Sequence, residues 1–472
     1  MSYSDLPGWL QELIPIGVLL AVIAFVIARL PRVEVGHSDA YRFRRLRNWL
    51  PVGLLYAFLY MGRYNLTVAF ASRSAADFGI VFWIGTWVYG CSFLVNGPLT
   101  DRIGGKRAIL IGAAGAAIAN ILLGVAARKG VEDVRTVFSV LYGANMYFQS
   151  FGAVAIVKIN APWFHVRERG VFGAIFGILI SLGIYFAFDW GKLIHDNLPA
   201  GWVFFIPGAL LILFFLIVLA TVKNTPGEAG FDDFDTADAS SGDEGPQLGA
   251  VKVFKMMLTN PIIMTIACIE FFSGFLRQAI MQWYRRFVEA TTVAPGEDES
   301  AEVYMGFVYE NWGLLLCCAG MLGGVFAGTI SDHVFQSRRG PVAAILYSVM
   351  LAGAVMLVFA LGGPLVGLLV LLMSMAVIGV HGMLSGTASM DFGGRRNVGV
   401  AVGIIDGFVY VGTGVMSLTY ALLLPDPEGE GAGQIENWNP WPIAMVPAAA
   451  LGLLLATRIW HAKPKPRSEA KA

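Results

Sequence analysis

The chain has 472 residues, of which 56% are hydrophobic and only 14% are charged, and its mean hydropathy is +0.65. Soluble domains carry about 25% charged residues, so this composition excludes an ordinary soluble globular protein. The 33 basic residues balance the 33 acidic ones, so net charge gives no sign of nucleic-acid binding, and we expect none. The many long apolar runs predict an all-α polytopic membrane protein.

Thirteen apolar segments are long enough to span a bilayer. Basic residues follow the first segment and none precedes it, which is the wrong polarity for a signal peptide. The positive-inside rule therefore predicts an outer N-terminus and a cytoplasmic C-terminus. The predicted spans lie near residues 10–29, 49–70, 80–99, 107–127, 134–158, 169–190, 201–222, 257–283, 308–330, 341–361, 364–386, 398–423 and 441–460.

The longest polar interruption divides the chain into two groups of six spans. Residues 223–252 are acidic, contain Gly, Pro and Ser, and lack helical periodicity, which is typical of a flexible linker. The predicted parts are an extra N-terminal transmembrane helix with a basic cytoplasmic linker (1–48), a six-helix bundle (49–222), an acidic cytoplasmic linker (223–256), a second six-helix bundle (257–460) and a cytoplasmic tail (461–472).

The two groups repeat a short motif at corresponding positions. "GPLTDRIGGKR" (97–107) ends the second span of the first group, and "GTISDHVFQSRR" (328–339) ends the second span of the other. Such a match predicts parallel internal repeats. Glycine permits close helix approach, while acidic and basic residues can cap helix ends and pair with each other. We expect gating and structural roles for Gly97, Asp101, Arg102, Lys106, Arg107, Gly328, Asp332, Arg338 and Arg339.

Each group also carries an arginine in its first span, Arg63 and Arg277. A charge at mid-membrane costs roughly 2.5–3.5 kcal/mol on insertion scales. Arg63 lies about 20 Å from the inner end of its span, too deep for easy snorkelling. Pseudo-symmetry predicts that the two arginines face each other across a central cavity, where an anion would relieve their repulsion. Guanidinium matches phosphate or carboxylate oxygens, and Tyr56 and Tyr60 lie on the helix face of Arg63.

These motifs resemble a known family. "GPLTDRIGGKR" is similar to the cytoplasmic signature of the major facilitator superfamily, which implies that fold, here with one extra N-terminal helix. The arginine pair resembles the organophosphate:phosphate antiporter branch, in which Asn follows the first arginine by two positions and Trp follows the second by six. The corresponding residues here are Asn65 and Trp283.

Two further blocks carry the same resemblance. "FQSFGAVAIVKINAPWFHVRERG" (148–170) resembles the fourth-helix signature, with Lys158 at its basic position, and "GIIDGFVYVGTG" (403–414) resembles the eleventh helix, with Tyr410 at a substrate-facing position. Phe93 and Ile180 replace a lysine and a histidine of the glycerol-phosphate carrier, which argues against glycerol phosphate as the substrate. His381 falls near a tyrosine of that carrier.

The resemblance implies a transporter, not an enzyme, that exchanges organic phosphates for inorganic phosphate by alternating access. It implies no cofactor and no metal, and we expect a monomer surrounded by lipid in a bacterial inner membrane. The residues expected to bind substrate are Arg63, Arg277, Tyr56, Tyr60, Asn65, Lys158, Tyr410 and His381.

Two intramembrane acids leave alternatives open, because such acids are usually functional. Glu270 either holds Arg277 while the cavity is empty or exchanges a proton, which would couple transport to protons. Asp406 pairs with a basic neighbour, caps a helix break at Gly403 and Gly407, or contacts substrate. The alternative functions are a proton-coupled carrier of another organic anion, such as a carboxylate or larger metabolite, and a transporter-like sensor of sugar phosphates. The short loops argue against the sensor.

Overall fold

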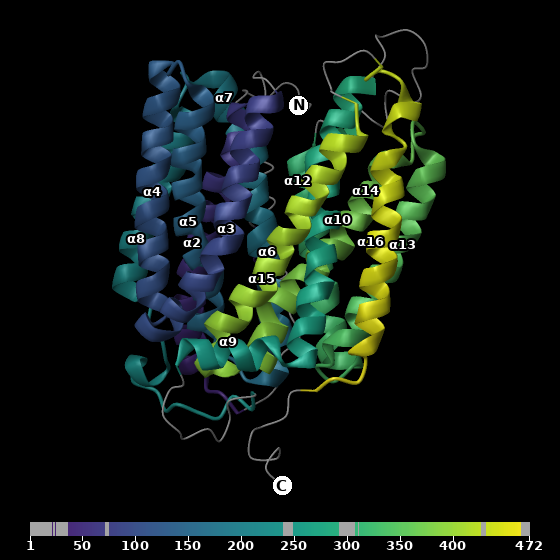
Figure 1. Ribbon diagram of the computed structural model, residues 1–472. Helices are drawn as coiled ribbons and strands as arrows, with labels where there is room; N and C mark the ends of the chain where they lie inside the picture. Colours follow the sequence, from purple (N-terminus) through teal and green to yellow (C-terminus); the bar gives the residue numbers. More distant parts are fainter. Residues whose placement is uncertain are drawn as a thin grey trace, which may run out of the picture.

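The computed structural model describes residues 21, 24, 36–70, 75–238, 249–291, 307–309, 311–425 and 431–463. Within these residues the protein consists of two groups of long helices that stand side by side (Figure 1). The predicted span near residues 10–29 lies almost wholly outside the described residues, so the extra helix stays a prediction.

The first group of helices, here called the first half, corresponds to the spans predicted between residues 49 and 222. Its long helices are α2 (Asp39–Ala69), α3 (Ala75–Ile103), α4 (Gly105–Lys129), α5 (Val134–Asn160), α6 (Arg169–Tyr185) and α8 (Trp202–Thr221). Short 3-10 turns (Ala161–Trp163 and Val166–Glu168) join α5 to α6, and a π-helical turn (Phe186–Trp190) joins α6 to α7 (Gly191–Asn197).

The second group of helices, the second half, repeats this plan. It contains α10 (Pro261–Thr291), α12 (Trp312–Thr329), α13 (Arg339–Ala360), α14 (Val366–His381), α15 (Ser389–Leu423) and α16 (Pro440–Arg458). Short π-helical segments follow α12 (Ile330–Val334) and α14 (Gly382–Ala388). Helix α15 is kinked where Gly394 (φ 69°) and Asn397 leave helical geometry, so its long straight part starts after Asn397.

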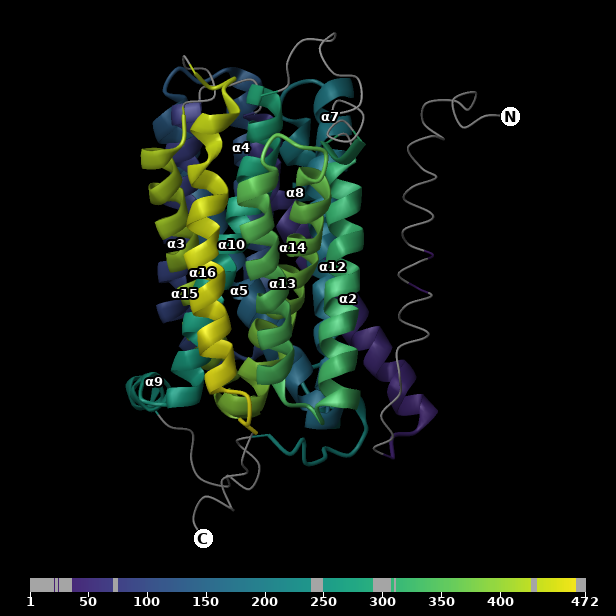
Figure 2. The ribbon, with the colours of Figure 1, turned by 90° about the vertical axis from the view of Figure 1, so that its right-hand side faces the viewer.

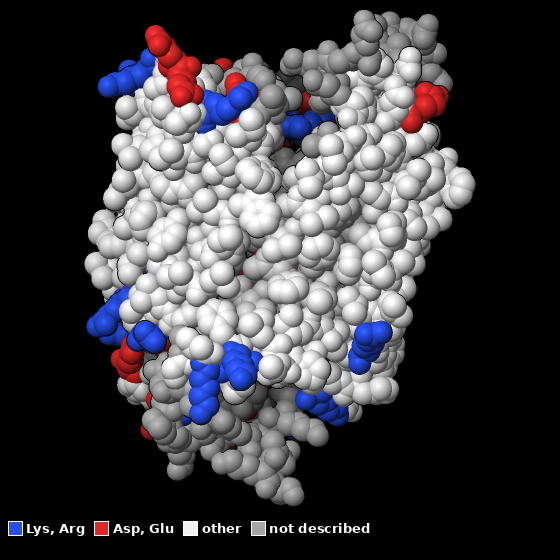
Figure 3. Space-filling view, in the orientation of Figure 1, with Lys and Arg blue, Asp and Glu red and all other residues white. Residues whose placement is uncertain are grey.

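Length and hydropathy identify ten membrane-spanning segments among the described residues, one of which, Val366–Tyr420, contains α14 and most of α15. Helix α2, which carries Arg63, is not among the ten. Lys, Arg, Asp and Glu gather at the two ends of the molecule, and an uncharged belt separates them on the face shown in Figure 3. This distribution is that of an integral membrane protein. The total of thirteen spans and their orientation stay predictions.

The two halves meet chiefly where α3 packs against α15 and where α6 packs against α12. Glycines bring these backbones close together. A Cβ atom on Gly97 would lie 2.7 Å from the carbonyl oxygen of Gly399, and one on Gly177 would lie 3.2 Å from the Cα of Gly324. Gly97, predicted to permit close helix approach, therefore lies in the interface between the halves.

The chain that connects the halves is more ordered than a flexible linker. Residues 223–238 fold against one end of the bundle, here called the linker end, where Thr236 and Asp238 are buried. Helix α9 (Ala250–Leu258) lies across this end and projects beside α15, seen end-on in Figure 2. Residues 223–238, part of the predicted flexible linker, thus pack against the bundle, where Asp238 takes part in an ion pair described below.

Candidate functional site

Arg63 lies inside the first half with only 1% of its surface exposed. Its Nε donates to Gln149 Oε1 (3.0 Å), its Nη1 to the Tyr410 hydroxyl (2.5 Å) and its Nη2 to the Tyr89 hydroxyl (2.9 Å). The guanidinium carbon also lies 4.6 Å from the ring centre of Tyr60. All three acceptors are neutral, so the charge of Arg63 is solvated but not balanced by a carboxylate among the described residues.

Arg277 lies in α10 of the second half and is 2% exposed. Its Nε and Nη1 are buried and have no hydrogen-bond partner in the part of the chain that the structure describes. An unpaired buried donor costs about 1–3 kcal/mol, and more when it is charged. The neighbouring Gln278 donates to the Tyr64 hydroxyl (2.9 Å) and so joins α10 to α2. Arg277 is therefore a buried cation with donors available for a ligand.

The two intramembrane acids have partners other than the arginines. Glu270 Oε2 lies 2.7 Å from His381 Nδ1, and Asp406 accepts a hydrogen bond from Ser385 (2.5 Å). Across residues 249–291 and 311–425, no direct ion pair joins Glu270 to Arg277, and the expectation that Glu270 holds Arg277 stays a prediction. Seven residues separate the two along α10, which is about 10 Å of helix, whereas α14 presents His381 directly to Glu270.

Of the other predicted substrate-binding residues, some lie near Arg63 and others lie away from it. Tyr60 and Tyr410 contact Arg63, and Tyr56 lies one turn away, edge-on to Tyr60 with a centroid distance of 5.2 Å. Asn65 points to the opposite side of α2, where it donates to Asn120 Oδ1 (2.8 Å) and to the Val203 carbonyl (3.1 Å). Two residues turn an α-helix by about 200°, so Asn65 cannot share the face of Arg63. Lys158 lies at the linker end.

Four polar residues near the arginines were missed by the sequence analysis: Tyr89, Gln149, Tyr64 and Gln278. Each is a polar side chain within an apolar span, the signal that also marks Arg63. Gln149 lies inside the fourth-helix block quoted above, and Tyr89 precedes Phe93 by one helical turn. The proximity of Tyr89 and Gln149 to Arg63 depends on how α3 and α5 are rotated about their own axes, which hydropathy does not specify.

At the linker end, Asp101 connects the two halves. Its Oδ1 lies 2.6 Å from Lys158 Nζ and accepts from the Gly399 backbone N–H (3.0 Å), and its Oδ2 accepts from the Val400 N–H (3.0 Å). Lys158 also donates to the carbonyls of Arg395 and Arg396 (2.8 and 2.9 Å). Asp101 therefore caps the straight part of α15, a favourable place for a carboxylate.

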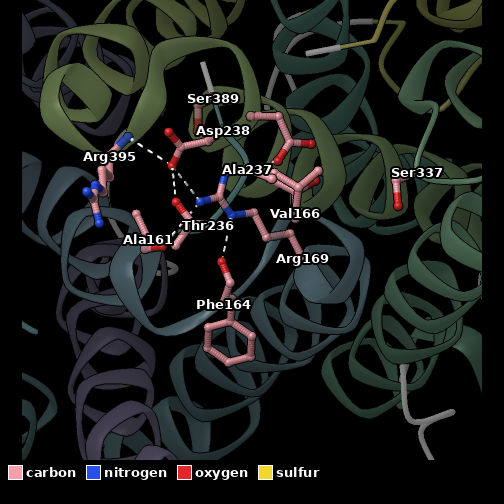
Figure 4. Close-up of polar contacts among 12 residues, drawn as sticks. Ala161, Phe164, Val166, Arg169, Thr236, Ala237, Asp238, Ser337, Ser389 and Arg395 are labelled. Atoms are coloured by element: carbon pink, nitrogen blue, oxygen red, sulfur yellow. Dashed lines mark hydrogen bonds and ion pairs between the residues drawn. The ribbon is translucent and has the colours of Figure 1, made fainter. Parts of the chain in front are cut away.

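A second connection is a buried chain of alternating charges, of which Figure 4 shows the link between Arg169 and Asp238. Arg169 of the first half pairs with Asp391 of the second half (3.2 Å) and with Asp238 of the linker (2.9 Å). Arg339 continues the chain from Asp391 (3.1 Å) to Asp332 (2.8 Å). The chain thus joins both halves and the linker while the linker end is closed.

The remaining residues of the two predicted motifs make only local contacts or are exposed. Arg102 and Arg107 are exposed, and Lys106 Nζ donates to the Leu219 carbonyl (2.8 Å) within the first half. Arg338 Nε donates to the Phe335 carbonyl (3.2 Å), and Gly328 is buried in α12. Of the motif residues, Gly97, Asp101 and Arg339 contact the other half, Arg339 through the Val166 carbonyl (3.5 Å), and Asp332 and Arg339 extend the charge chain.

Comparison with known proteins gives the chain a context. The family model described as Major Facilitator Superfamily matches residues 52–417. The chain is 24% identical over 454 residues to the glycerol-3-phosphate transporter of Bacillus subtilis, covering 91% of this chain and 96% of that one. It is 24% identical over 462 residues to the probable hexose phosphate transport protein of Chlamydia pneumoniae, covering 90% and 93%.

Two other similarities bear on function and fold. The membrane sensor protein UhpC of Salmonella typhimurium is 24% identical over 470 residues, covering 94% of this chain and 98% of that one. The crystal structure of a Major Facilitator Superfamily transporter, FucP, in the outward conformation superposes with a TM-score of 0.63 at 15% identity, covering 88% of this chain and 99% of that chain. The structural similarity establishes the fold alone.

Proposed function

The chain belongs to the Major Facilitator Superfamily, and from this premise we propose that it exchanges organic phosphates for inorganic phosphate by alternating access. It is a transmembrane transporter, and relatives aligned over nine-tenths of the chain are named as glycerol-3-phosphate and hexose phosphate transporters. We place it in the inner membrane of a bacterium, acting as a monomer without a cofactor.

The observation that carries the proposal is the pair of buried, unbalanced guanidinium groups. Arg63 is solvated by neutral groups, and Arg277 has two buried donors without a partner in the described structure. A phosphoryl group carries two negative charges and offers several acceptor oxygens, so it can neutralise both arginines and accept bidentate hydrogen bonds. A neutral sugar would satisfy the donors but leave the charges unbalanced.

The same arrangement supplies a reason for exchange. Arg63 belongs to the first half and Arg277 to the second, so a bound phosphate draws the halves together, as Tyr410 already does by bonding Arg63 across the interface. Without an anion, two like charges in a low-dielectric site repel each other. The empty carrier is therefore destabilised by a repulsion that is absent from the loaded carrier. This difference in free energy favours the return step with a second anion bound.

Arginine-to-lysine variants test this clamp. Lys keeps the charge but loses the planar fork, so Arg63→Lys and Arg277→Lys should each abolish exchange of labelled phosphate in proteoliposomes. Arg135→Lys is the matched control, because Arg135 pairs with Asp77 on the surface of the first half. Retained exchange in both central variants would refute the clamp.

A second candidate function is proton-coupled transport of another organic anion. The Glu270–His381 pair favours it, because a buried carboxylate and imidazole at 2.7 Å can share and release a proton. Glu270→Gln separates the candidates: strict phosphate exchange should survive the substitution, whereas uptake driven by a proton gradient should be lost.

A third candidate is a sensor that binds a sugar phosphate without transporting it. The similarity to UhpC, named as a membrane sensor protein, is the observation in its favour. Transport of labelled substrate by the purified protein in proteoliposomes excludes a pure sensor, whereas specific binding without any transport would support one.

A further inference from the structure

An apolar groove, here called the α3–α15 groove, lies on the outside of the molecule where these two helices meet. It has a volume of about 210 Å³, and α9 supplies part of its wall. We propose that this groove binds an acyl chain of an anionic phospholipid, whose headgroup lies at the lysines of α9. The site is separate from the arginine pair, so the inference holds whatever cargo the protein carries.

The groove opens toward lipid. Its wall includes Trp87 and Leu94 of α3 and Val411 of α15, which are 45%, 63% and 44% exposed. Helices α3 and α15 lie on the face shown in Figure 1, and on that face an uncharged belt separates the charged ends (Figure 3). The described residues that line the groove are themselves uncharged. The groove therefore faces the hydrocarbon of the bilayer rather than water.

Glycines create the space between the two helices. Toward the linker end, a Cβ on Gly97 would lie 2.7 Å from the Gly399 carbonyl oxygen. About two turns farther along both helices, a Cβ on Gly407 would lie 3.9 Å from the Gly90 carbonyl oxygen. The backbones thus diverge there, and Gly90 and Gly407 place no side chain in the gap. Both line the groove together with Tyr410.

An acyl chain is the occupant that fits such a groove. Apolar cavities do not hold water, because a water molecule would find too few hydrogen-bond partners there. An empty gap would forfeit the dispersion contacts of its walls. A methylene group takes about as much space as a water molecule, roughly 30 Å³, so 210 Å³ has room for about seven carbons of one chain.

Helix α9 supplies the selectivity for an anionic headgroup. Its Phe254 and Leu258 line the groove, its Met257 is buried, and its Lys252 and Lys255 are exposed. A helix with one apolar and one basic side lies in the membrane interface, with its lysines among the headgroups. Basic side chains at this level attract anionic lipids. A lipid held there can extend a chain past Phe254 into the groove.

The occupied groove also affects the two halves of the protein. A chain between α3 and α15 contacts the first half and the second half at once. It therefore binds most tightly when the two helices have the spacing seen here, with the linker end closed, and it shifts the population toward that state. Tyr410, which accepts from Arg63, lines the groove as well, so the chain packs beside a residue of the central site.

Lipid binding to the full-length protein tests the groove. In detergent micelles, native mass spectrometry with one added lipid at a time should show tighter binding of phosphatidylglycerol than of phosphatidylcholine with the same chains. Gly407→Leu fills the groove and should weaken phosphatidylglycerol binding about tenfold, because the chain loses its contacts. Gly79→Leu is the matched control, since Gly79 is an exposed glycine of α3 with open space around it.

A second pair of variants tests the headgroup. Removing both lysines of α9 in Lys252→Gln/Lys255→Gln should weaken phosphatidylglycerol binding about tenfold, to the level of phosphatidylcholine. The control is Lys129→Gln/Lys192→Gln, which removes two exposed lysines at the opposite end of the molecule and should leave the affinity unchanged.

Photocrosslinking of the unmodified protein gives a readout that does not depend on how the variants fold. Phosphatidylglycerol with a diazirine in its acyl chain should label the peptides that contain Cys91 of α3 and Phe408 of α15, both of which line the groove. The inference is overturned if these peptides stay unlabelled, if folded Gly407→Leu keeps the parent affinity, or if the two lipids bind the parent protein equally. Failure of the phosphate clamp would appear instead in the exchange assay, which does not measure lipid binding.

Discussion

Asp101 is the residue whose replacement should most directly open the linker end. Within the part of the chain that the structure describes, its carboxylate contacts Lys158 Nζ at 2.6 Å and accepts from the N–H groups of Gly399 and Val400 at 3.0 Å each. The last two cross from the first half to the second. Asp101→Asn keeps the size of the side chain but removes its charge, so the substitution tests electrostatics rather than packing.

The expected magnitude follows from the burial of the pair. The side chains of Lys158 and Asp101 are 15% and 6% exposed. Removing one partner of a buried ion pair costs about 3–5 kcal/mol. Lys158 retains two carbonyl acceptors and some solvent, so we expect the lower value, about 3 kcal/mol against the closed state. A change of this size alters the ratio of closed to open protein about a hundredfold.

Spin-label distances across the linker end measure this ratio. In a variant without the four native cysteines, labels at Arg102 and His333 should give a longer distance population in Asp101→Asn than in the parent protein. Asp77→Asn is the control, since it breaks a surface pair with Arg135 inside the first half, and such pairs contribute little. An unchanged distance distribution in Asp101→Asn would show that the carboxylate does not hold the halves together.

Three further substitutions test other parts of the structure. Tyr410→Phe removes the hydroxyl that accepts from Arg63 and should weaken phosphate binding about tenfold in a titration. Tyr56→Phe, one turn from the arginine, should leave the affinity unchanged. Equal losses of affinity in the two variants would contradict the arrangement of these tyrosines around Arg63. Gly97→Val places a side chain where a Cβ alone would lie 2.7 Å from the Gly399 carbonyl oxygen. The halves should therefore separate, and the short distance between spin labels at Arg102 and His333 should disappear. If the short distance persists, α3 and α15 do not pack this closely. Asp238→Asn leaves Arg169 with one carboxylate partner among the described residues, Asp391, and should lower the stability of the fold by about 3 kcal/mol, measured by thermal unfolding. The exposed Asp232→Asn should have no effect, and similar melting temperatures for the two variants would show that the linker is not anchored by this pair.

The amino-acid sequence was sufficient for the plan of the fold and for the centre of the site. Helices in a membrane must satisfy their own backbone hydrogen bonds, so long apolar segments indicate them, and twelve predicted spans coincide with long helices of the described chain. A charge inside an apolar run is costly, so Arg63 and Arg277 stand out without knowledge of the fold. The repeated motif likewise predicted that Asp101 lies at a helix end with a basic partner.

The tertiary structure decided which side chains meet. Asn65 faces α4 and α8 rather than the arginines, and Glu270 pairs with His381 rather than Arg277, because helix rotation and the register between spans set these contacts. Lys158 serves the linker end, where the kink in α15 brings two carbonyl groups to its ammonium. Asp238 belongs to the acidic stretch predicted to be a flexible linker, and its ion pair with the buried guanidinium of Arg169 places it in the interior. Local sequence determines what crosses the membrane, whereas long-range packing determines which polar groups share the space between the halves.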